Sequence, residues 1–267
     1  MGYEYDDDTA TTSIGEGRFR SDISPRWNIG DNPNGGYLLG CALRPMLDVA
    51  GAQGKLDPLS LTAHYLRPTS VGAADVDVDL VRGGRRHVHL QARLVQETER
   101  VRVLGVFGDL TESTASPVLD RGAPPPLPPP DECLGRDNPA STAGAPTMMG
   151  RFESRFAPDT PWLLGRRSEE TVITGWIRFA DGRPPDTASL PMVVDAFPPA
   201  VFSLGRSGWV PTIELTVHVR ARPVPGWLRC RFETRFVAGA YLEEDGEVWD
   251  ESDRLVAESR QLAMLLG

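Results

Sequence analysis

The amino-acid sequence predicts an α+β protein made of two tandem copies of one domain, each with one helix and a long antiparallel sheet. Three observations support this prediction. Residues 61–68 (LTAHYLRP) reappear at 215–223 (LTVHVRARP), with one extra residue in the second copy. Each copy then runs into alternating residues, such as Val76 and Val78 set between aspartates, which is the periodicity of a strand. A proline-rich segment separates the copies, so a duplicated domain is favoured over a stack of short repeats.

The proline-rich segment sets the domain boundaries. We predict an N-terminal domain at residues 1–112, a linker at 113–146 and a C-terminal domain at 147–267. Within the linker, residues 124–130 (PPPLPPP) favour an extended polyproline conformation over a helix or a strand inside a sheet. Two domains of about 130 residues are each large enough to bury a core.

In the first domain, residues 17–23 are a short strand candidate. Asparagine and glycine make 28–34 a loop. Apolar residues at helical spacing predict a helix over 36–50, which Pro45 kinks because proline lacks the N–H donor. Three to four strands follow, up to Asp109, with a hairpin at Gly83-Gly84.

The second domain repeats this order. A helix is expected near residues 188–197, because Pro198-Pro199 interrupts or ends it. The expected strands lie at about 150–156, 171–179, 212–221, 228–237, 247–250 and 255–265. Each half is therefore expected to be one helix with a long antiparallel meander.

Composition limits the possible functions. The chain has 267 residues, with 28 basic and 37 acidic ones, and its net charge of −9 disfavours broad binding to nucleic acid or to a membrane surface. Its three cysteines, Cys41, Cys133 and Cys230, have no CxxC spacing, so we expect a reduced, cytoplasmic protein with no metal box. Residues 1–13 are acidic and polar, unlike a signal peptide, and no apolar run approaches about 20 residues.

Seven segments, in order along nearly the whole chain, resemble type II acyl-CoA thioesterases. Those of the first half match that family's helix start, central strand and following hairpin: 32–40 (NPNGGYLLG), 61–68 (LTAHYLRP) and 80–85 (LVRGGR). Those of the second half are 176–178 (WIR), 193–198 (VVDAFP), 212–214 (TIE) and 256–261 (VAESRQ). The resemblance implies a double hotdog, in which two tandem hotdog domains each wrap a bent antiparallel sheet around a long helix.

The resemblance also implies a catalytic trio of Asp195, Thr212 and Gln261 that holds and activates a water for attack on a thioester. A carboxylate can take a proton from water, while a hydroxyl and an amide can fix its position. Backbone N–H groups after Gly35-Gly36 are expected to polarise the thioester carbonyl, since the helix N-terminus favours negative charge. The substrate is an acyl-CoA, and no further cofactor is implied.

Each of these residues also has a structural interpretation. Asp195 can be a polar residue at the edge of a packed helix, Thr212 and Gln261 ordinary strand residues, and Gly35-Gly36 a turn with close packing. The histidines His64 and His218 occupy matching places in the repeat and are expected to be packed side chains. Candidates for the coenzyme A phosphates, with ordinary surface arginines as the alternative, are Arg82, Arg85, Arg86, Arg206, Arg220 and Arg222.

Three functions therefore follow from the sequence. The first is an acyl-CoA thioesterase with a small-molecule substrate and neither a nucleic-acid nor a membrane partner. The second is a non-catalytic module that binds an acyl group or acyl-CoA. The third is a hotdog hydratase or dehydratase, which would need a histidine and an acid near the helix start, where Asn34 and Gly35 stand instead. A double hotdog is complete as a monomer, and a homo-oligomer of such units is also compatible with the sequence.

Overall fold

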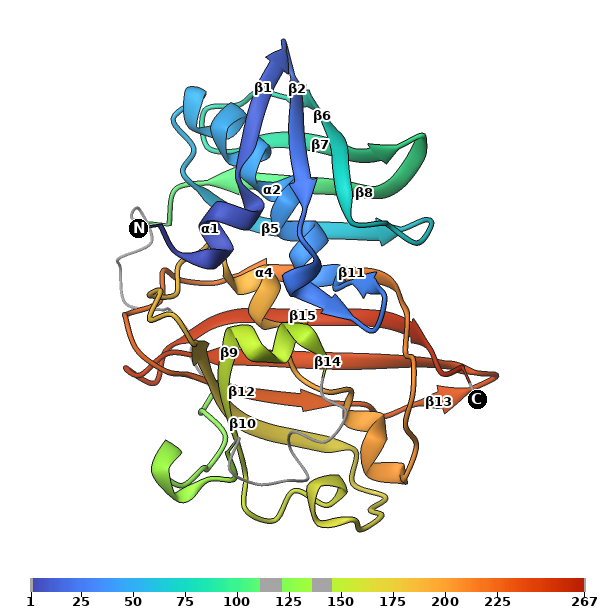
Figure 1. Ribbon diagram of the computed structural model, residues 1–267. Coiled ribbons are helices and arrows are strands. Elements are labelled where there is room, and N and C mark those ends of the chain that lie inside the picture. Colours follow the sequence, from blue (N-terminus) through green and yellow to red (C-terminus); the bar gives the residue numbers. More distant parts are fainter. Residues whose placement is uncertain (1, 111–121, 136–145, 267) are drawn as a thin grey trace.

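One antiparallel sheet runs through the whole molecule. The computed structural model describes residues 2–110, 122–135 and 146–266, and within them thirteen strands form this sheet (Figure 1). The strand order is β1-β2-β6-β7-β8-β5-β11-β15-β14-β12-β10-β9, with β13 paired to β14. The first half supplies the strands from β1 to β5 in this order, and the second half supplies the rest. This is the double-hotdog arrangement that the sequence predicts.

The elements of the first half are α1 (Glu4–Thr9), β1 (Thr11–Gly15), β2 (Arg18–Ile23), β3 (Asn28–Ile29), β4 (Asn32–Pro33), α2 (Gly35–Ala52), β5 (Asp57–Tyr65), β6 (Gly72–Arg82), β7 (Val88–Gln96) and β8 (Thr98–Gly108). Those of the second half are β9 (Phe152–Phe156), β10 (Val172–Phe179), α4 (Leu190–Val193), β11 (Thr212–Val219), β12 (Leu228–Glu233), β13 (Val237–Ala238), β14 (Tyr241–Trp249) and β15 (Leu255–Met264). Short 3-10 helices include η4 (Thr147–Arg151), η5 (Trp162–Leu164) and η6 (Ala200–Leu204).

The two copies of the repeat pair with each other at the centre of the sheet. Strand β5 lies antiparallel to β11, and Thr62 stands directly opposite Thr216. These residues occupy the same position in the two copies, so an approximate twofold axis passes between them. Their hydroxyl oxygens are 3.0 Å apart and share a hydrogen bond. The pairing of β5 with β11 therefore makes one continuous sheet out of the two domains.

The two helices differ sharply in length. Helix α2 is confirmed, with 18 residues, Asn34 as its N-cap and Pro45 inside it. The expected second helix over 188–197 is wrong in extent, because α4 has only four residues. Proline disfavours helical backbone at the residue before it, so Pro198 excludes helix at Phe197, and α4 already ends at Val193. The backbone of α4 instead packs on the start of α2, where a Cβ on Gly36 would lie 2.9 Å from the Pro191 carbonyl oxygen.

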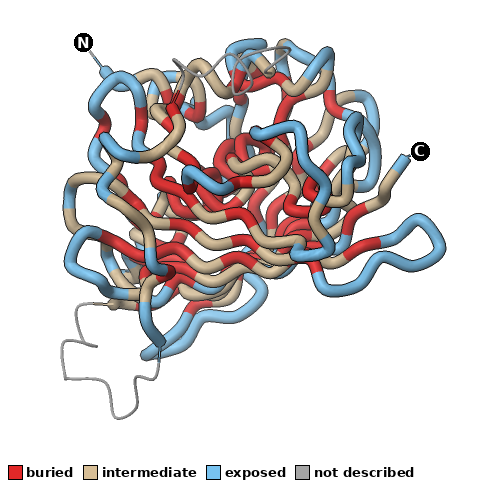
Figure 2. The backbone as a smooth tube through the Cα atoms, turned by 90° about the horizontal axis from the view of Figure 1, so that it is seen from below, coloured by how far each residue is buried: buried red, intermediate tan, exposed pale blue. Residues whose placement is uncertain are grey.

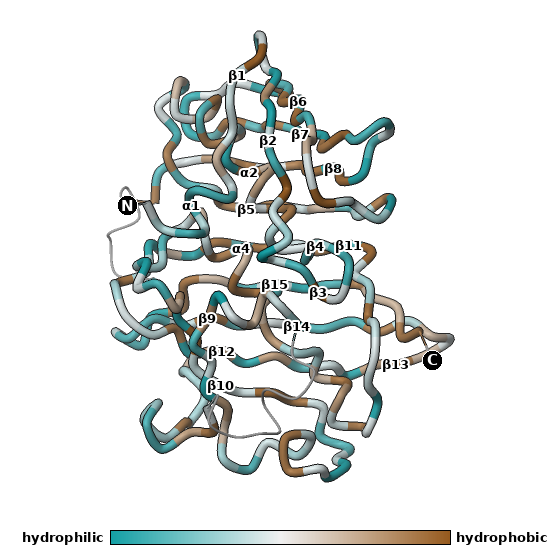
Figure 3. The backbone as a smooth tube through the Cα atoms, viewed as in Figure 1, coloured by the Kyte–Doolittle hydropathy of each residue, from teal (hydrophilic) through white to brown (hydrophobic). Residues whose placement is uncertain are grey.

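The predicted strands are present, and the expected loop at 28–34 also contains the two-residue strands β3 and β4. The meander is wrong for both halves, because β5 pairs with β8 and not with its sequence neighbour β6, and β11 pairs with β15 and not with β12. The strand expected at 247–250 begins six residues earlier, as β14. Along the strands, hydrophilic and hydrophobic positions interleave (Figure 3), and the buried part of the chain gathers in the middle of the molecule (Figure 2). Buried strand residues share one hydrophobic core with the buried residues of α2. No helix in the described residues is long and apolar enough to span a membrane.

The proline-rich linker lies partly outside the described residues, but 122–135 is described. This stretch crosses the outer face of the second half of the sheet. The Trp176 indole donates a hydrogen bond to the Pro128 carbonyl at 2.9 Å, and the guanidinium of Arg229 reaches the Pro125 carbonyl at 3.4 Å. Leu134 also forms an isolated bridge with Phe156 at the end of β9. The polyproline stretch is thus fixed against the second domain.

Helix α1 fastens the N-terminus to the second half of the molecule. Arg183, with only 4% of its side chain exposed, donates to Asp6 of α1 at 2.9 Å and to Asp186 at 2.7 Å. The guanidinium lies 5.3 Å from the ring centre of Tyr5, a residue buried in the core. The Glu4 carboxylate also accepts a hydrogen bond from Arg151 at 2.8 Å. Charge and apolar burial therefore act together at this junction.

We expect Arg183→Met to lower the free energy of unfolding by about 1–3 kcal/mol, because it removes buried, charge-assisted hydrogen bonds that hold α1 in place. The matched control is Arg235→Met, whose guanidinium is 54% exposed in its pair with Asp245. That change should alter stability by less than about 1 kcal/mol. Urea denaturation measures both, and equal effects of the two substitutions would contradict the role given to Arg183.

Candidate active site

Asp195 lies where the two domains meet. It follows α4, and its carboxylate reaches the N-terminus of α2 in the other domain. Its Oδ2 atom accepts hydrogen bonds from the Gly36 N–H at 2.7 Å and from the Asn34 side-chain amide at 2.9 Å. The same amide donates to the Asp195 backbone carbonyl at 3.0 Å. Asp195 is thus held by the first domain although the second domain carries it.

The sequence Asn-Gly-Gly explains this contact. The Asn34 side-chain oxygen accepts from the Tyr37 N–H at 2.9 Å, as an N-cap does, and this turns the amide NH2 group toward Asp195. At Gly36 a Cβ would stand 2.8 Å from the Cβ of Asp195, closer than side chains approach. Glycine is therefore required for the carboxylate to reach the helix start. This role of Asn34 was not predicted, although asparagine is a preferred N-cap residue and was a signal for it.

The surroundings of Asp195 make it a weaker acid than usual. Burial in the protein raises its pKa to about 6, and the hydrogen bonds from Gly36 and Asn34 oppose that rise. Its second oxygen, Oδ1, has no hydrogen-bond partner in the described residues. The side chain thus combines one fixed oxygen with one that makes no hydrogen bond within the described residues. A carboxyl group of this pKa can exchange a proton near neutral pH.

Thr212 and Gln261 contact each other on the inner face of the sheet. The Thr212 hydroxyl donates to the Gln261 side-chain oxygen at 2.8 Å. The pairing of β11 with β15 carries an irregularity between Thr212 and Glu214, where a β-bulge shifts the register. Without it, alternation would place Thr212 on the same face as Glu214. The bulge therefore turns Thr212 inward, and the sequence contains no recognisable signal of it.

The buried carboxylate of Glu244 extends the Thr212–Gln261 hydrogen bond by a third group. This residue was not predicted from the sequence. It stands opposite Gln261 in the β14–β15 pairing. Its Oε1 accepts from the Gln261 amide at 2.9 Å, and its Oε2 accepts from the Ala200 N–H at 2.6 Å. Burial raises its pKa to about 7, and the nearby charge of Asp195 adds to the rise. The only sequence signal for it was strand alternation, which places Glu244 on the same face of β14 as Leu242 and Val248.

The predicted trio is therefore only partly joined. Thr212 and Gln261 are in contact, whereas no hydrogen bond in the described part of the chain links either of them to Asp195. The electrostatic influence of Asp195 on Glu244 indicates that the two groups lie near each other. The site consists of the acid at the α2 N-terminus and a Thr–Gln–Glu chain on the sheet.

Of the two glycine N–H groups expected to polarise a carbonyl, that of Gly36 is already bound to Asp195. The Gly35 N–H has no hydrogen-bond partner in the described residues and remains available. Gly35 is also tightly packed, since a Cβ there would stand 3.0 Å from the Tyr65 ring. Its carbonyl accepts from the Tyr65 hydroxyl at 2.8 Å, which fixes the peptide at the helix start. The close packing expected of the glycine pair is thus confirmed, and the polarising role stays a prediction for Gly35.

The six candidate arginines do not gather at this site. Thr212 and Tyr65 mark one end of the antiparallel β5–β11 pair, and Asp57 begins β5 at the other end. Arg222 binds the buried Asp57 carboxylate with two hydrogen bonds, of 2.9 and 2.8 Å, so it serves as a structural ion pair between the domains. Arg220 pairs with Glu258 at 3.5 Å, also toward the Asp57 end.

The remaining four candidate arginines are exposed. Arg82, Arg85 and Arg86 belong to the β6–β7 hairpin, which follows the Asp57 end of the sheet through the Val88–Phe107 pair. Only Arg206, six residues before Thr212, lies on the connection into the candidate site. His64 and His218 are also exposed, on the outer face of the central strands. The expectation that these histidines are packed was wrong, because their register points them away from the core.

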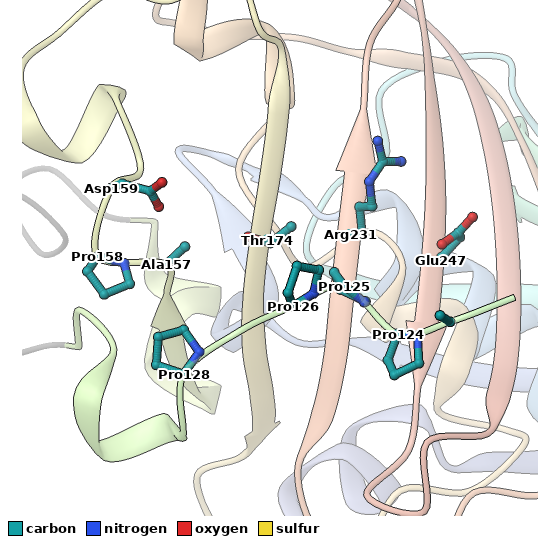
Figure 4. A pocket seen from close by; sticks show the side chains of 11 residues that line it. Pro124, Pro125, Pro126, Pro128, Ala157, Pro158, Asp159, Thr174, Arg231 and Glu247 are labelled. Atoms are coloured by element: carbon teal, nitrogen blue, oxygen red, sulfur yellow. The ribbon is translucent and has the colours of Figure 1, made fainter.

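A surface cavity of about 800 Å³ lies elsewhere, on the outer face of the sheet (Figure 4). The polyproline stretch forms one side of it, and strands β10, β12 and β14 supply Thr174, Arg231 and Glu247. Glu247 is three residues from Glu244, so the two side chains point to opposite faces of β14. This cavity is therefore separate from Asp195, Thr212 and Gln261.

Comparison with known proteins identifies the family. Residues 23–108 match the acyl-CoA thioesterase N-terminal domain, and residues 130–265 match the acyl-CoA thioesterase C-terminal domain. An uncharacterized protein of Mycobacterium tuberculosis (strain ATCC 25618 / H37Rv) is 28% identical over 272 residues, which cover 92% of this chain and 90% of that protein.

Solved structures agree with this result. A protein of Thermobifida fusca YX assigned as a thioesterase II has a TM-score of 0.89 and 30% identity, covering 99% of this chain and 98% of the other. The acyl-CoA thioesterase II TesB2 of Mycobacterium marinum shares the fold at a TM-score of 0.71 and 16% identity, with 98% of each chain covered. The chain described here therefore belongs to the acyl-CoA thioesterase family and carries both of its domains.

Proposed function

We propose that this protein hydrolyses an acyl-CoA to the free acid and coenzyme A, with Asp195 as the general base. The observation that carries the proposal is the Asp195 carboxylate, which is held at a helix N-terminus through Oδ2, while its Oδ1 has no hydrogen-bond partner in the described residues. Membership of the acyl-CoA thioesterase family supports the substrate class. The reaction requires water and the thioester, and no cofactor.

In the proposed reaction, Asp195 Oδ1 takes a proton from a water while the water oxygen bonds to the thioester carbonyl carbon. The carbonyl oxygen becomes negative and is stabilised by the Gly35 N–H, where the helix dipole also favours negative charge. The tetrahedral intermediate then collapses and breaks the carbon–sulfur bond. Coenzyme A leaves as a thiolate, and the proton on Asp195 returns to that sulfur. Thr212 and Gln261 hold the water in place.

The alternatives have less support in the geometry. A hydratase or dehydratase would need a histidine near the start of α2, where Asn34 instead caps the helix and binds Asp195. A binding module without catalysis does not require an acid whose pKa is raised to about 6, whereas proton transfer does. All three cysteines are free thiols, which fits the cytoplasmic location that we propose.

We expect Asp195→Asn to reduce kcat by about 10²- to 10⁴-fold, because an amide keeps the acceptor for Gly36 but cannot take a proton. Release of free thiol from short, medium and long acyl-CoAs measures this. The matched control is Asp159→Asn in the outer cavity, which should leave kcat unchanged. Binding of acyl-CoA without thiol release by the wild type would favour the binding module, and hydration of an enoyl-CoA would favour the hydratase.

The raised pKa also predicts a pH dependence of stability. Between the ordinary pKa of 3.8 and about 6, the folded protein binds more protons at Asp195 than the unfolded chain does. The stability that Asp195 contributes is therefore fully present below a pH of 3.8, and it is lost as the pH rises through about 6. The loss is on the order of 3 kcal/mol. Urea denaturation across this range should show a smaller decline for Asp195→Asn than for the wild type, and parallel curves would contradict the assignment.

A further inference from the structure

We propose that Glu244 is a positioning residue, which fixes the direction of the hydrogen-bond chain that ends at the Thr212 hydroxyl. The inference rests on the proposed thioesterase function and adds a residue to its site. Four groups form the chain: the Ala200 N–H, the Glu244 carboxylate, the Gln261 amide and the Thr212 hydroxyl. The distances between successive groups are 2.6, 2.9 and 2.8 Å.

The direction of this chain follows from the chemistry of its first two groups. A backbone N–H can only donate, and an ionised carboxylate can only accept. Gln261 must therefore present its NH2 group to Glu244 and its carbonyl oxygen to Thr212. The Thr212 hydroxyl can then only donate to Gln261. The Ala200 N–H and the Glu244 carboxylate together therefore fix the orientation of the Gln261 amide.

A purely structural role would not require a carboxylate at this position. Glu244 is 5% exposed and lies beside a small apolar cluster of Val201, Leu242 and Ala263. No lysine or arginine of the described chain forms an ion pair with it. A buried carboxylate without a cation is costly to fold. The charge is instead matched to nearby donors: the Ala200 N–H, the Gln261 amide and the Thr234 hydroxyl.

The direction has a consequence for the reacting water. Because the Thr212 hydrogen is used toward Gln261, only the lone pairs of its oxygen are left for the site. A water bound there must donate one hydrogen to Thr212. Its other hydrogen is then directed to Asp195 Oδ1, and its own lone pair is free to attack the carbonyl carbon. If the chain ran the other way, Thr212 would donate to the water and occupy the lone pair that must react.

The substitution Glu244→Gln tests this. The new amide must offer its oxygen to Ala200, so its NH2 group faces Gln261, which turns over and reverses the Thr212 hydrogen bond. We expect kcat to fall about 10- to 100-fold while KM changes little, because the loss concerns the oriented nucleophile and not substrate binding. The control is Glu243→Gln, the same change one residue away on the outer face of β14, which should leave kcat unchanged.

A double variant separates the effect of the hydrogen-bond direction from the effect of side-chain shape. In Glu244→Gln combined with Gln261→Glu, the amide at 244 accepts from Ala200 and donates to the carboxylate at 261, which again accepts from Thr212. The double variant should therefore recover most of the kcat lost in Glu244→Gln. Gln261→Glu alone places two carboxylates in contact and should be the least active of the three. Assays at about pH 8 keep the Glu244 carboxyl group of the wild type ionised, since the pKa of Glu244 is raised to about 7.

Folded Glu244→Gln protein with wild-type kcat would overturn the proposal, as would a folded double variant no more active than Glu244→Gln. Nuclear Overhauser effects give a readout without turnover. The Gln261 NH2 protons should lie near the Glu244 side chain in the wild type and near the Thr212 methyl in Glu244→Gln. The same contacts in both proteins would also overturn it. Absence of thiol release by the wild type would instead reject the proposed function, and the Overhauser effects would still decide the orientation.

Discussion

The pairing of β5 with β11 is the contact on which the rest of the structure depends. It joins two domains into one sheet, and it places the start of α2, from the first domain, beside α4, from the second. The site therefore takes its helix N-terminus from one copy and its acid, hydroxyl and amide from the other. Neither domain alone contains the arrangement, because Asp195 has its side-chain hydrogen bonds with the first domain.

Within that frame, the site depends on a balance between burial and hydrogen bonding. Burial raises the pKa of Asp195 and of Glu244, and donors from the backbone and from side-chain amides keep both carboxyl groups able to ionise. The donors are provided by local features: an asparagine cap and a glycine at the start of α2, the Ala200 N–H at the start of η6, and an inward glutamine on β15. The cation that a buried carboxylate usually requires is replaced by oriented dipoles.

The sequence predicted the duplicated fold, the longer helix and most strands because each leaves a periodic or repeated pattern. It did not predict the short α4, since the packing of its backbone on Gly36 is a tertiary contact that no local pattern records. The bulge before Glu214 and the inward position of Glu244 were missed for the same reason. Arg222 was misread because an arginine bound to a buried carboxylate has the same sequence signature as one that awaits a phosphate. Binding of the coenzyme A phosphates by the candidate arginines stays a prediction, and among them Arg206 lies on the connection into the candidate site.

The approximate twofold axis between Thr62 and Thr216 relates the folds of the two domains but not their chemistry. Leu215 stands opposite Gln261, whereas Leu61, its counterpart in the repeat, stands opposite Gly105. A side chain at Gly105 would collide with Phe107, Met46 and Leu61. In a dimer of identical single domains, a substitution that improved one site would also alter its twin. Linking both copies in one chain removes that constraint, so one copy can specialise as scaffold while the other acquires reactive groups.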